Sequence, residues 1–229
     1  MTEVVVHERK EREMIRWRRD RIRNRSALVS AGLLLAVDVF GVLLMGVQPS
    51  AAQELVIGEA QSMRDDGGFR VHPGIVFIFE GAVRDYVRPM RHNLAEDMTD
   101  VHIEARVNWD TENIPDGTPE GGFVPYLNIS AKVTNESTGD IAFVPVPPHI
   151  NLIDNFHYAY NMQLPGERSD LYTVEFFVSP PGKVVAKHRD WLDNYGRTVM
   201  MKKTFKFEGV NFTEIACAAP RDGSSGTRC

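Results

Sequence analysis

Histidine and carboxylate side chains are the residues of this chain whose spacing could support chemistry. His102 and Glu104 stand two positions apart in the run 101–107, which reads VHIEARV and alternates strictly between apolar and polar residues. Because successive side chains of a β-strand point to opposite faces, residues two apart project from the same face. His102 and Glu104 can therefore converge on one metal ion.

Three further histidines lie later in the chain. His149 and His157 flank the predicted loop 150–156, which contains Asp154, and His188 follows a pair of prolines at 180 and 181. Imidazole together with carboxylate suits iron, copper or zinc. A single histidine in a β domain is more often a hydrogen-bonded residue than a ligand, so this prediction requires the fold to bring several of them together.

Other chemistries find little support in the sequence. The chain has only two cysteines, Cys217 and Cys229, both near the C-terminus, and their spacing matches no thiolate zinc motif. They form either a disulfide, as an oxidising compartment would allow, or two surface thiols. No nucleophile elbow, phosphate-binding loop or dinucleotide fingerprint is present. We expect a binding or structural protein rather than an enzyme.

Short strand-like runs punctuated by Pro, Gly and Asn must position these residues. Such a pattern is typical of an all-β, immunoglobulin-like β-sandwich. A hairpin turn is predicted at 135–139, and the proline-containing pairs at 147–148, 165–166 and 180–181 predict loops. The predicted strands are 75–79, 101–109, 124–134, 141–146, 171–178 and 204–207.

The N-terminal region predicts a membrane segment. Residues 1–25 carry nine basic and five acidic side chains and are followed at 27–47 by an apolar run whose only charge is Asp38. About 20 apolar residues cross a bilayer, and flanking basic residues stay on the cytoplasmic side. This predicts a single-pass protein of the inner (cytoplasmic) membrane with its main domain in the periplasm. The predicted organisation is a head (1–25), a transmembrane helix (26–48), a linker (49–72), the sandwich (73–210) and a tail (211–229).

Two alternatives stay open for this segment. It is either a retained anchor or a signal peptide cleaved after the small residues 50–52. Within an anchor, Asp38 either contacts a helical partner, with Gly32 and Ala36 permitting close approach, or is protonated in the lipid.

The charge balance argues against a nucleic-acid partner. Outside residues 1–25 the chain holds 17 basic and 26 acidic side chains. Phosphate binding needs clustered Lys and Arg instead.

Several stretches resemble the periplasmic iron-transport protein family. They read VHIEARV (101–107), GGFVPYLNISAKV (121–133), FVPVPPHINLIDNFHYAYNMQLPG (143–166), YTVEFFVSPP (172–181) and KHRD (187–190), and the resemblance spans residues 73–210. It implies a dimeric β-sandwich that binds copper and iron beside a high-affinity iron permease. The metal ligands it implies are His102, Glu104, His157 and His188, with Asp154 matching an acidic residue of the family.

The chain also departs from the family pattern. The family's M-P-M segment, whose second Met is a copper ligand, reads Val144-Pro145-Val146 here. About four extra residues precede His157 and bring His149, which either replaces the lost ligand or lies on the surface. Loss of a thioether weakens Cu(I) binding most and leaves nitrogen and oxygen ligands suited to iron or zinc.

Two functional hypotheses follow. In the first, the protein is an accessory subunit that braces a larger membrane complex, such as a photosynthetic reaction centre with its antenna or a respiratory assembly. Its partners would be membrane proteins contacted through the helix around Asp38 and through the periplasmic domain. In the second, it is a periplasmic iron- or copper-binding protein that delivers metal to an iron permease, with a homodimer implied by the resemblance.

Overall fold

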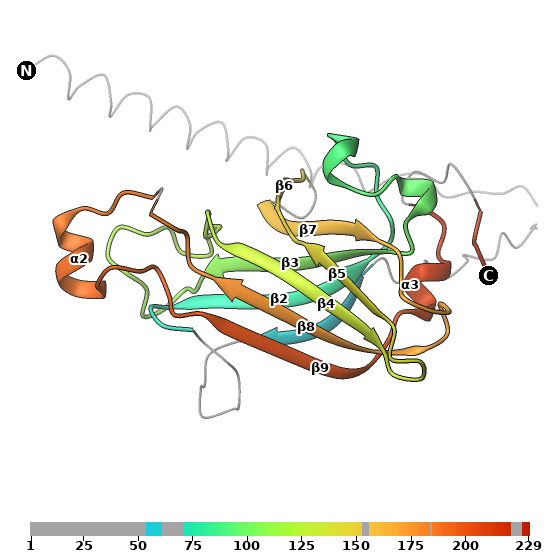
Figure 1. Cartoon of the computed structure of the whole chain (residues 1–229). Coiled ribbons are helices and arrows are strands. Elements are labelled where there is room, and N and C mark those ends of the chain that lie inside the picture. The colour runs from blue at the N-terminus through green and yellow to red at the C-terminus, as the bar shows by residue number, and fades with distance from the viewer. Residues whose placement is uncertain (1–53, 61–70, 153–155, 184, 221–225) are drawn as a thin grey trace, which may run out of the picture. The chain divides into compact units, whose positions relative to one another are not determined.

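The computed structural model describes residues 54–60, 71–152, 156–183, 185–220 and 226–229 (Figure 1). The predicted head, the transmembrane helix 26–48 and Asp38 lie outside these residues. Within the described part of the chain, no helix is long and apolar enough to span a membrane. The predictions for the N-terminal segment therefore stay predictions.

In the described residues, nine strands form two antiparallel sheets. The first has the order β1-β2-β3-β7-β6 and the second the order β5-β4-β8-β9. The strands are β1 (Glu54–Ala60), β2 (Ile75–Ala82), β3 (Val101–Trp109), β4 (Asn128–Asn135), β5 (Ile141–Pro145), β6 (Pro148–Ile150), β7 (Phe156–Met162), β8 (Leu171–Ser179) and β9 (Lys203–Asn211). With β1 set aside, this is the strand order of the A-B-E-D and C′-C-F-G sheets of an immunoglobulin domain.

The core lies between the two sheets. Alternate residues of β8, such as Val174 and Phe176, are fully buried because strand side chains alternate between faces. Phe79 of β2 stacks on Phe176 with ring centroids 4.2 Å apart and also packs on Phe205 of β9. The predicted all-β class and the predicted strands at 75–79, 101–109, 124–134, 141–146, 171–178 and 204–207 are confirmed, with shifted ends.

The predicted linker 49–72 is wrong over residues 54–60, which form the edge strand β1. Its Leu55 and Ile57 pack against the core. Gly58, which reads as a linker residue, permits close packing between strands. A Cβ built at Gly58 would lie 2.0 Å from Cε1 of Phe207 in β9.

The predicted loop 150–156 is shorter than expected because β6 and β7 occupy its ends. Pro148 begins β6, and proline is tolerated there because β6 is an edge strand. The predicted hairpin turn at 135–139 connects β4 to β5, as expected.

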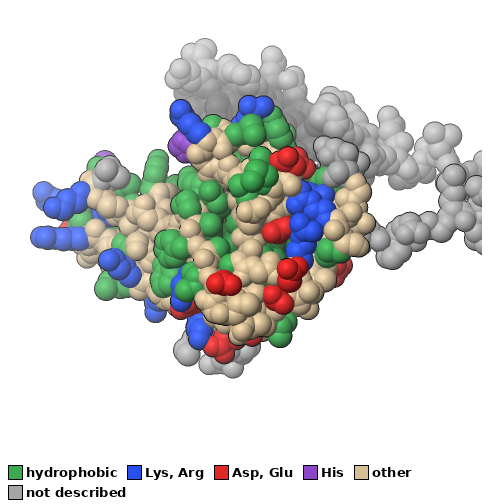
Figure 2. Space-filling model, turned by 45° about the vertical axis from the view of Figure 1, so that its right-hand side comes forward, with side chains coloured by type: hydrophobic (Ala, Val, Ile, Leu, Met, Phe, Trp, Pro, Cys, Tyr) green, Lys and Arg blue, Asp and Glu red, His purple; other side chains and the backbone are tan. Residues whose placement is uncertain are grey.

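Short helices cap the sandwich: η1 (Met90–His92), η2 (Glu96–Met98), α2 (Arg189–Tyr195) and α3 (Thr213–Cys217). The domain continues beyond the predicted boundary at 210, because Cys217 of α3 forms a disulfide with Cys229. Next to it, the Arg228 guanidinium donates a hydrogen bond of 2.5 Å to the Thr99 carbonyl. The described parts of the predicted tail 211–229 are thus held against the domain. On the face drawn in Figure 2, acidic side chains lie beside the basic ones.

Candidate metal centre

Strand β3 carries His102 and Glu104 in the middle of the first sheet. Both side chains are buried, at 3% and 2% exposure. The face of the sheet that bears them is covered by the segment preceding β3, since the side-chain amide of Asn161 donates hydrogen bonds to the carbonyls of Asp85 and Leu94 in that segment. Although its sequence alternates between apolar and polar residues, β3 is therefore covered on both faces where the site lies.

Strands β7 and β6 carry the other two histidines. His157 of β7 is 1% exposed, and His149 of β6 lies directly opposite it across the antiparallel pair. Strand β7 pairs with β3 on its other side, which brings His157 to the face that bears His102. The next residue, Tyr158, points to the core and donates a hydrogen bond of 2.9 Å to the Val124 carbonyl, which holds β7 in place.

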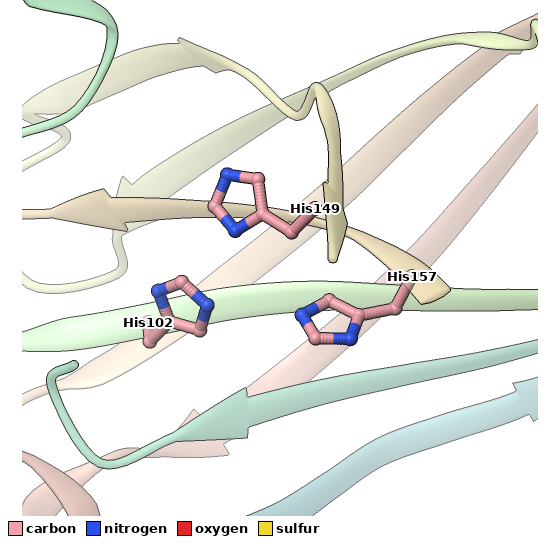
Figure 3. Close-up of side chains that lie close together, drawn as sticks. All are labelled: His102, His149 and His157. Carbon is pink, nitrogen blue, oxygen red and sulfur yellow. The ribbon is translucent and has the colours of Figure 1, made fainter. Parts of the chain in front are cut away.

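The three imidazoles form one cluster (Figure 3). Their ring centroids lie 5.4 Å apart for His102 and His149, 6.2 Å for His102 and His157, and 5.9 Å for His149 and His157. One nitrogen from each ring lies within 4.8 Å of those of the other two. Two nitrogens bound to one tetrahedral ion are about 3.4 Å apart, from metal–nitrogen bonds of about 2.05 Å. Small side-chain rotations would bring the three onto one ion.

The cluster opens into a pocket of about 610 Å³. Its wall comes from residues 85–88 and 148–152, and His102 and His157 line it as well. On the rim, Ile150 is 82% exposed and Leu152 is 99% exposed. An ion at the cluster would therefore be reached from solvent without opening the core.

The environment of His149 favours the state that binds metals. Burial, and secondarily the neighbouring His157, lower the pKa of His149 from 6.5 to about 4. Its ring is therefore neutral at pH 7, and a neutral imidazole is what a metal ion requires. Its Nε2 atom is buried, and none of the described groups forms a hydrogen bond with it.

Glu104 adjoins the cluster on the side of His102. Its Oε1 atom lies 3.6 Å from Nε2 of His102, close to the spacing of two ligands on one ion. Glu104 is not part of the group in which all ligand atoms lie within 4.8 Å of one another. Across the β2–β3 pair it faces Glu80, whose carboxylate accepts a hydrogen bond from Arg106. A carboxylate beside the imidazoles favours a cation at the site.

The remaining predicted ligands are placed as follows. His188 is exposed at the N-cap of α2 and does not join the three imidazoles of this chain. Asp154 lies outside the described residues. Val146, which stands where the resemblance expects a methionine, is 1% exposed and belongs to the hydrophobic core.

Sequence reasoning missed Asn161. It lies directly opposite His102 across the β3–β7 pair, and its Oδ1 is 2.6 Å from Nδ1 of His102. Only the register of two strands separated by about fifty residues brings these side chains together. The sequence carried no signal of that register.

Fold and site together define a class of protein, a two-sheet β-sandwich whose first sheet presents clustered histidines to an open pocket. The sequence matches the Fe2+ transport protein family over residues 51–213, and the chain belongs to that family. The predicted resemblance is confirmed.

Individual relatives agree with this assignment. UPF0423 proteins of Brucella abortus and Brucella melitensis are 30% identical over 150 residues, which covers 64% of this chain and 72% of theirs. A copper-bound variant of Campylobacter jejuni P19 has a similar fold, with a TM-score of 0.54, 22% identity and coverage of 68% of this chain and 96% of its own. A copper-bound variant of FetP from uropathogenic Escherichia coli has a TM-score of 0.50, 22% identity and coverage of 62% and 93%.

Proposed function

We propose that this protein is a periplasmic metal-binding protein that captures iron or copper and delivers it to a membrane permease. The observation that carries the proposal is the cluster of His102, His149 and His157, whose ligand atoms lie within 4.8 Å of one another beside a pocket. The family is described as an Fe2+ transport protein family, and the two structural relatives named above are copper-bound proteins.

The ligand set points to a divalent ion. Three imidazoles and a nearby carboxylate suit Fe(II), Cu(II) or Zn(II), whereas Cu(I) prefers soft thioether or thiolate ligands. Neither Met nor Cys is among the described residues that line the pocket, and Val146, at the position of the family's methionine, packs in the core. His149 supplies a third nitrogen from the neighbouring edge strand instead.

The position of the site suits a cargo that must enter and leave. His149 lies on β6, a strand of only three residues at the edge of the sheet, and the pocket rim at Ile150 and Leu152 is exposed. A ligand on such a short edge strand can move without disturbing the core. We therefore propose that the metal is transferred through this opening to the permease, and that the protein acts as a carrier without an enzymatic step.

The predicted anchor fits this proposal, because a tethered carrier would stay close to its permease. A homodimer is proposed from the family resemblance alone. The rival hypothesis of an accessory subunit in a photosynthetic or respiratory complex gains no support from the family or from the relatives. The comparisons favour the carrier hypothesis.

The proposal is tested with the full-length protein purified from membranes in detergent. Metal content is measured by mass spectrometry, and affinities for Fe(II), Cu(II) and Zn(II) are measured by titration. We expect about one ion per chain in the wild-type protein and none in the His102→Ala/His157→Ala variant. His92→Ala is the matched control, because His92 is exposed on η1 and lies outside the cluster. A wild-type protein that holds no metal as purified and binds none on titration would refute the proposal.

A further inference from the structure

We propose that Asn161 is a positioning residue that holds His102 in the tautomer with the hydrogen on Nδ1, so that the Nε2 lone pair is directed at the metal. The statement that Nε2 is directed at a metal rests on the proposed function. The tautomer itself is a property of the metal-free protein.

The hydrogen-bond network assigns the orientation of the Asn161 amide. Asn161 is fully buried, and its Nδ2 lies 2.8 Å from the Asp85 carbonyl oxygen and 3.1 Å from the Leu94 carbonyl oxygen. Both carbonyls only accept hydrogen bonds, so the NH2 group of Asn161 must face them. The flipped amide would place Oδ1 against two carbonyl oxygens and leave both amide hydrogens without these acceptors.

The oriented amide then fixes the proton of His102. The Asn161 Oδ1 atom is 2.6 Å from Nδ1 of His102 and can only accept a hydrogen bond. A neutral imidazole carries its hydrogen on one nitrogen, and here that nitrogen must be Nδ1. The lone pair is consequently on Nε2, the atom that lies 3.6 Å from the carboxylate of Glu104. The Nε2 lone pair and the Glu104 carboxylate are then two donor groups close enough to bind one cation.

The same hydrogen bonds connect the ligand to the wall of the pocket. Asp85 lines the pocket, and Leu94 belongs to the segment that leads into β3. Asn161 therefore fixes the ring of His102 relative to the pocket through which an ion would reach it. Partners that fix the tautomer and orientation of a ligating histidine typically account for 10- to 100-fold in metal affinity.

The experiment uses the metal-free, full-length protein with 15N-labelled histidine. Long-range 1H–15N correlation spectra at pH 8 distinguish a protonated ring nitrogen from one that carries a lone pair. We expect His102 of the wild-type protein to show a protonated Nδ1 and an unprotonated Nε2. A neutral His102 ring with its proton on Nε2 in the wild-type protein would overturn the proposal without any variant.

Two variants separate positioning from general support of the fold. Asn161→Leu removes all three hydrogen bonds, and we expect mixed tautomers of His102 with a 10- to 100-fold weaker affinity for Zn(II). Asn161→Asp keeps an acceptor for Nδ1 but no donor for Asp85 and Leu94, so the tautomer should be retained. The matched control is Asn135→Leu, because Asn135 is equally buried and hydrogen-bonded to Asp170, but on β4 of the other sheet.

We expect Asn135→Leu to lower thermal stability while leaving the tautomer and the Zn(II) affinity unchanged. A loss of affinity in Asn161→Leu with an unchanged tautomer would show a merely structural role and overturn the proposal. A wild-type protein with the expected tautomer but no affinity for Zn(II), Fe(II) or Cu(II) would overturn the proposed function. The wrong tautomer in a protein that binds metal would overturn only the role of Asn161.

Discussion

Replacing His149 by phenylalanine should separate the stability of the metal-free protein from its affinity for metal. The Nε2 atom of His149 is buried without a hydrogen bond among the described groups, and the ring is half-buried on an edge strand. A buried polar atom without a partner costs about 1–3 kcal/mol, and the partial exposure of this side chain favours the lower end. Phenylalanine keeps the ring and removes the polar atom. We expect the metal-free variant to be as stable as the wild-type protein, or more stable by about 1 kcal/mol.

The same change should weaken metal binding strongly. Structural zinc sites with four ligands bind with about 10–16 kcal/mol, or roughly 3 kcal/mol per ligand. Loss of the His149 ligand should therefore raise the dissociation constant about 100-fold. At a metal concentration of 100 times the wild-type dissociation constant, the ion stabilises the wild-type protein by about 2.7 kcal/mol. The variant should gain only about 0.4 kcal/mol, because that metal concentration is about equal to the dissociation constant of the variant.

Urea unfolding at pH 7.5, with chelator and with Zn(II), measures both quantities in one experiment. His92→Phe serves as the control, because His92 is exposed and lies outside the cluster. The reasoning fails if His149→Phe destabilises the metal-free protein by more than about 1 kcal/mol and still gains the full wild-type stabilisation from metal. That combination would identify His149 as a structural residue rather than a ligand.

Three further predictions concern the metal-free domain. Replacing both Cys217 and Cys229 by serine should lower the free energy of unfolding by about 2–3 kcal/mol, because the disulfide that joins them closes a short loop. An unchanged midpoint of urea unfolding would contradict this prediction. Phe79→Ala should lower the free energy of unfolding by about 3–5 kcal/mol, because Phe79 is fully buried. Phe143→Ala should lower it by less than about 1 kcal/mol, because Phe143 is 63% exposed. Thermal unfolding compares the two variants. The pKa of His149 is about 4 in the folded protein, compared with 6.5 in the unfolded chain. As the pH is lowered, the unfolded chain therefore takes up a proton first. Stability should be complete above pH 6.5 and fall by about 1–2 kcal/mol towards pH 4, a loss absent from His149→Phe and reduced from the full linkage value by the partial exposure of the ring.

The strands that the sequence predicted share a strong local pattern. Runs such as 101–107 alternate in polarity, and this pattern predicts a strand whatever surrounds it. Strands β1, β6 and β7 were not among the predicted strands. The evidence for β1 and β6 is tertiary. Gly58 reads as a linker residue until the ring of Phe207 is seen packed against it, and Pro148 excludes a central strand but not an edge strand.

The site was predictable only in part. His102 and Glu104 follow from their spacing on one strand, while His157 came from the resemblance. The role of His149 stayed open, because it depends on the pairing of β6 with β7, which places it directly opposite His157. Asn161 could not be found, because its importance rests on the register between β3 and β7. Long-range register is set by packing of the whole domain, and one sequence does not display it.

X-ray absorption spectroscopy of the full-length protein loaded with one equivalent of Cu(II) shows whether the histidine cluster binds the ion. The spectrum reports how many imidazole rings bind the ion. We expect three imidazole ligands in the wild-type protein, two in His149→Phe, and three in His92→Phe. A copper ion bound without imidazole, or a wild-type spectrum that His149→Phe leaves unchanged, would show that the three histidines are not a metal site.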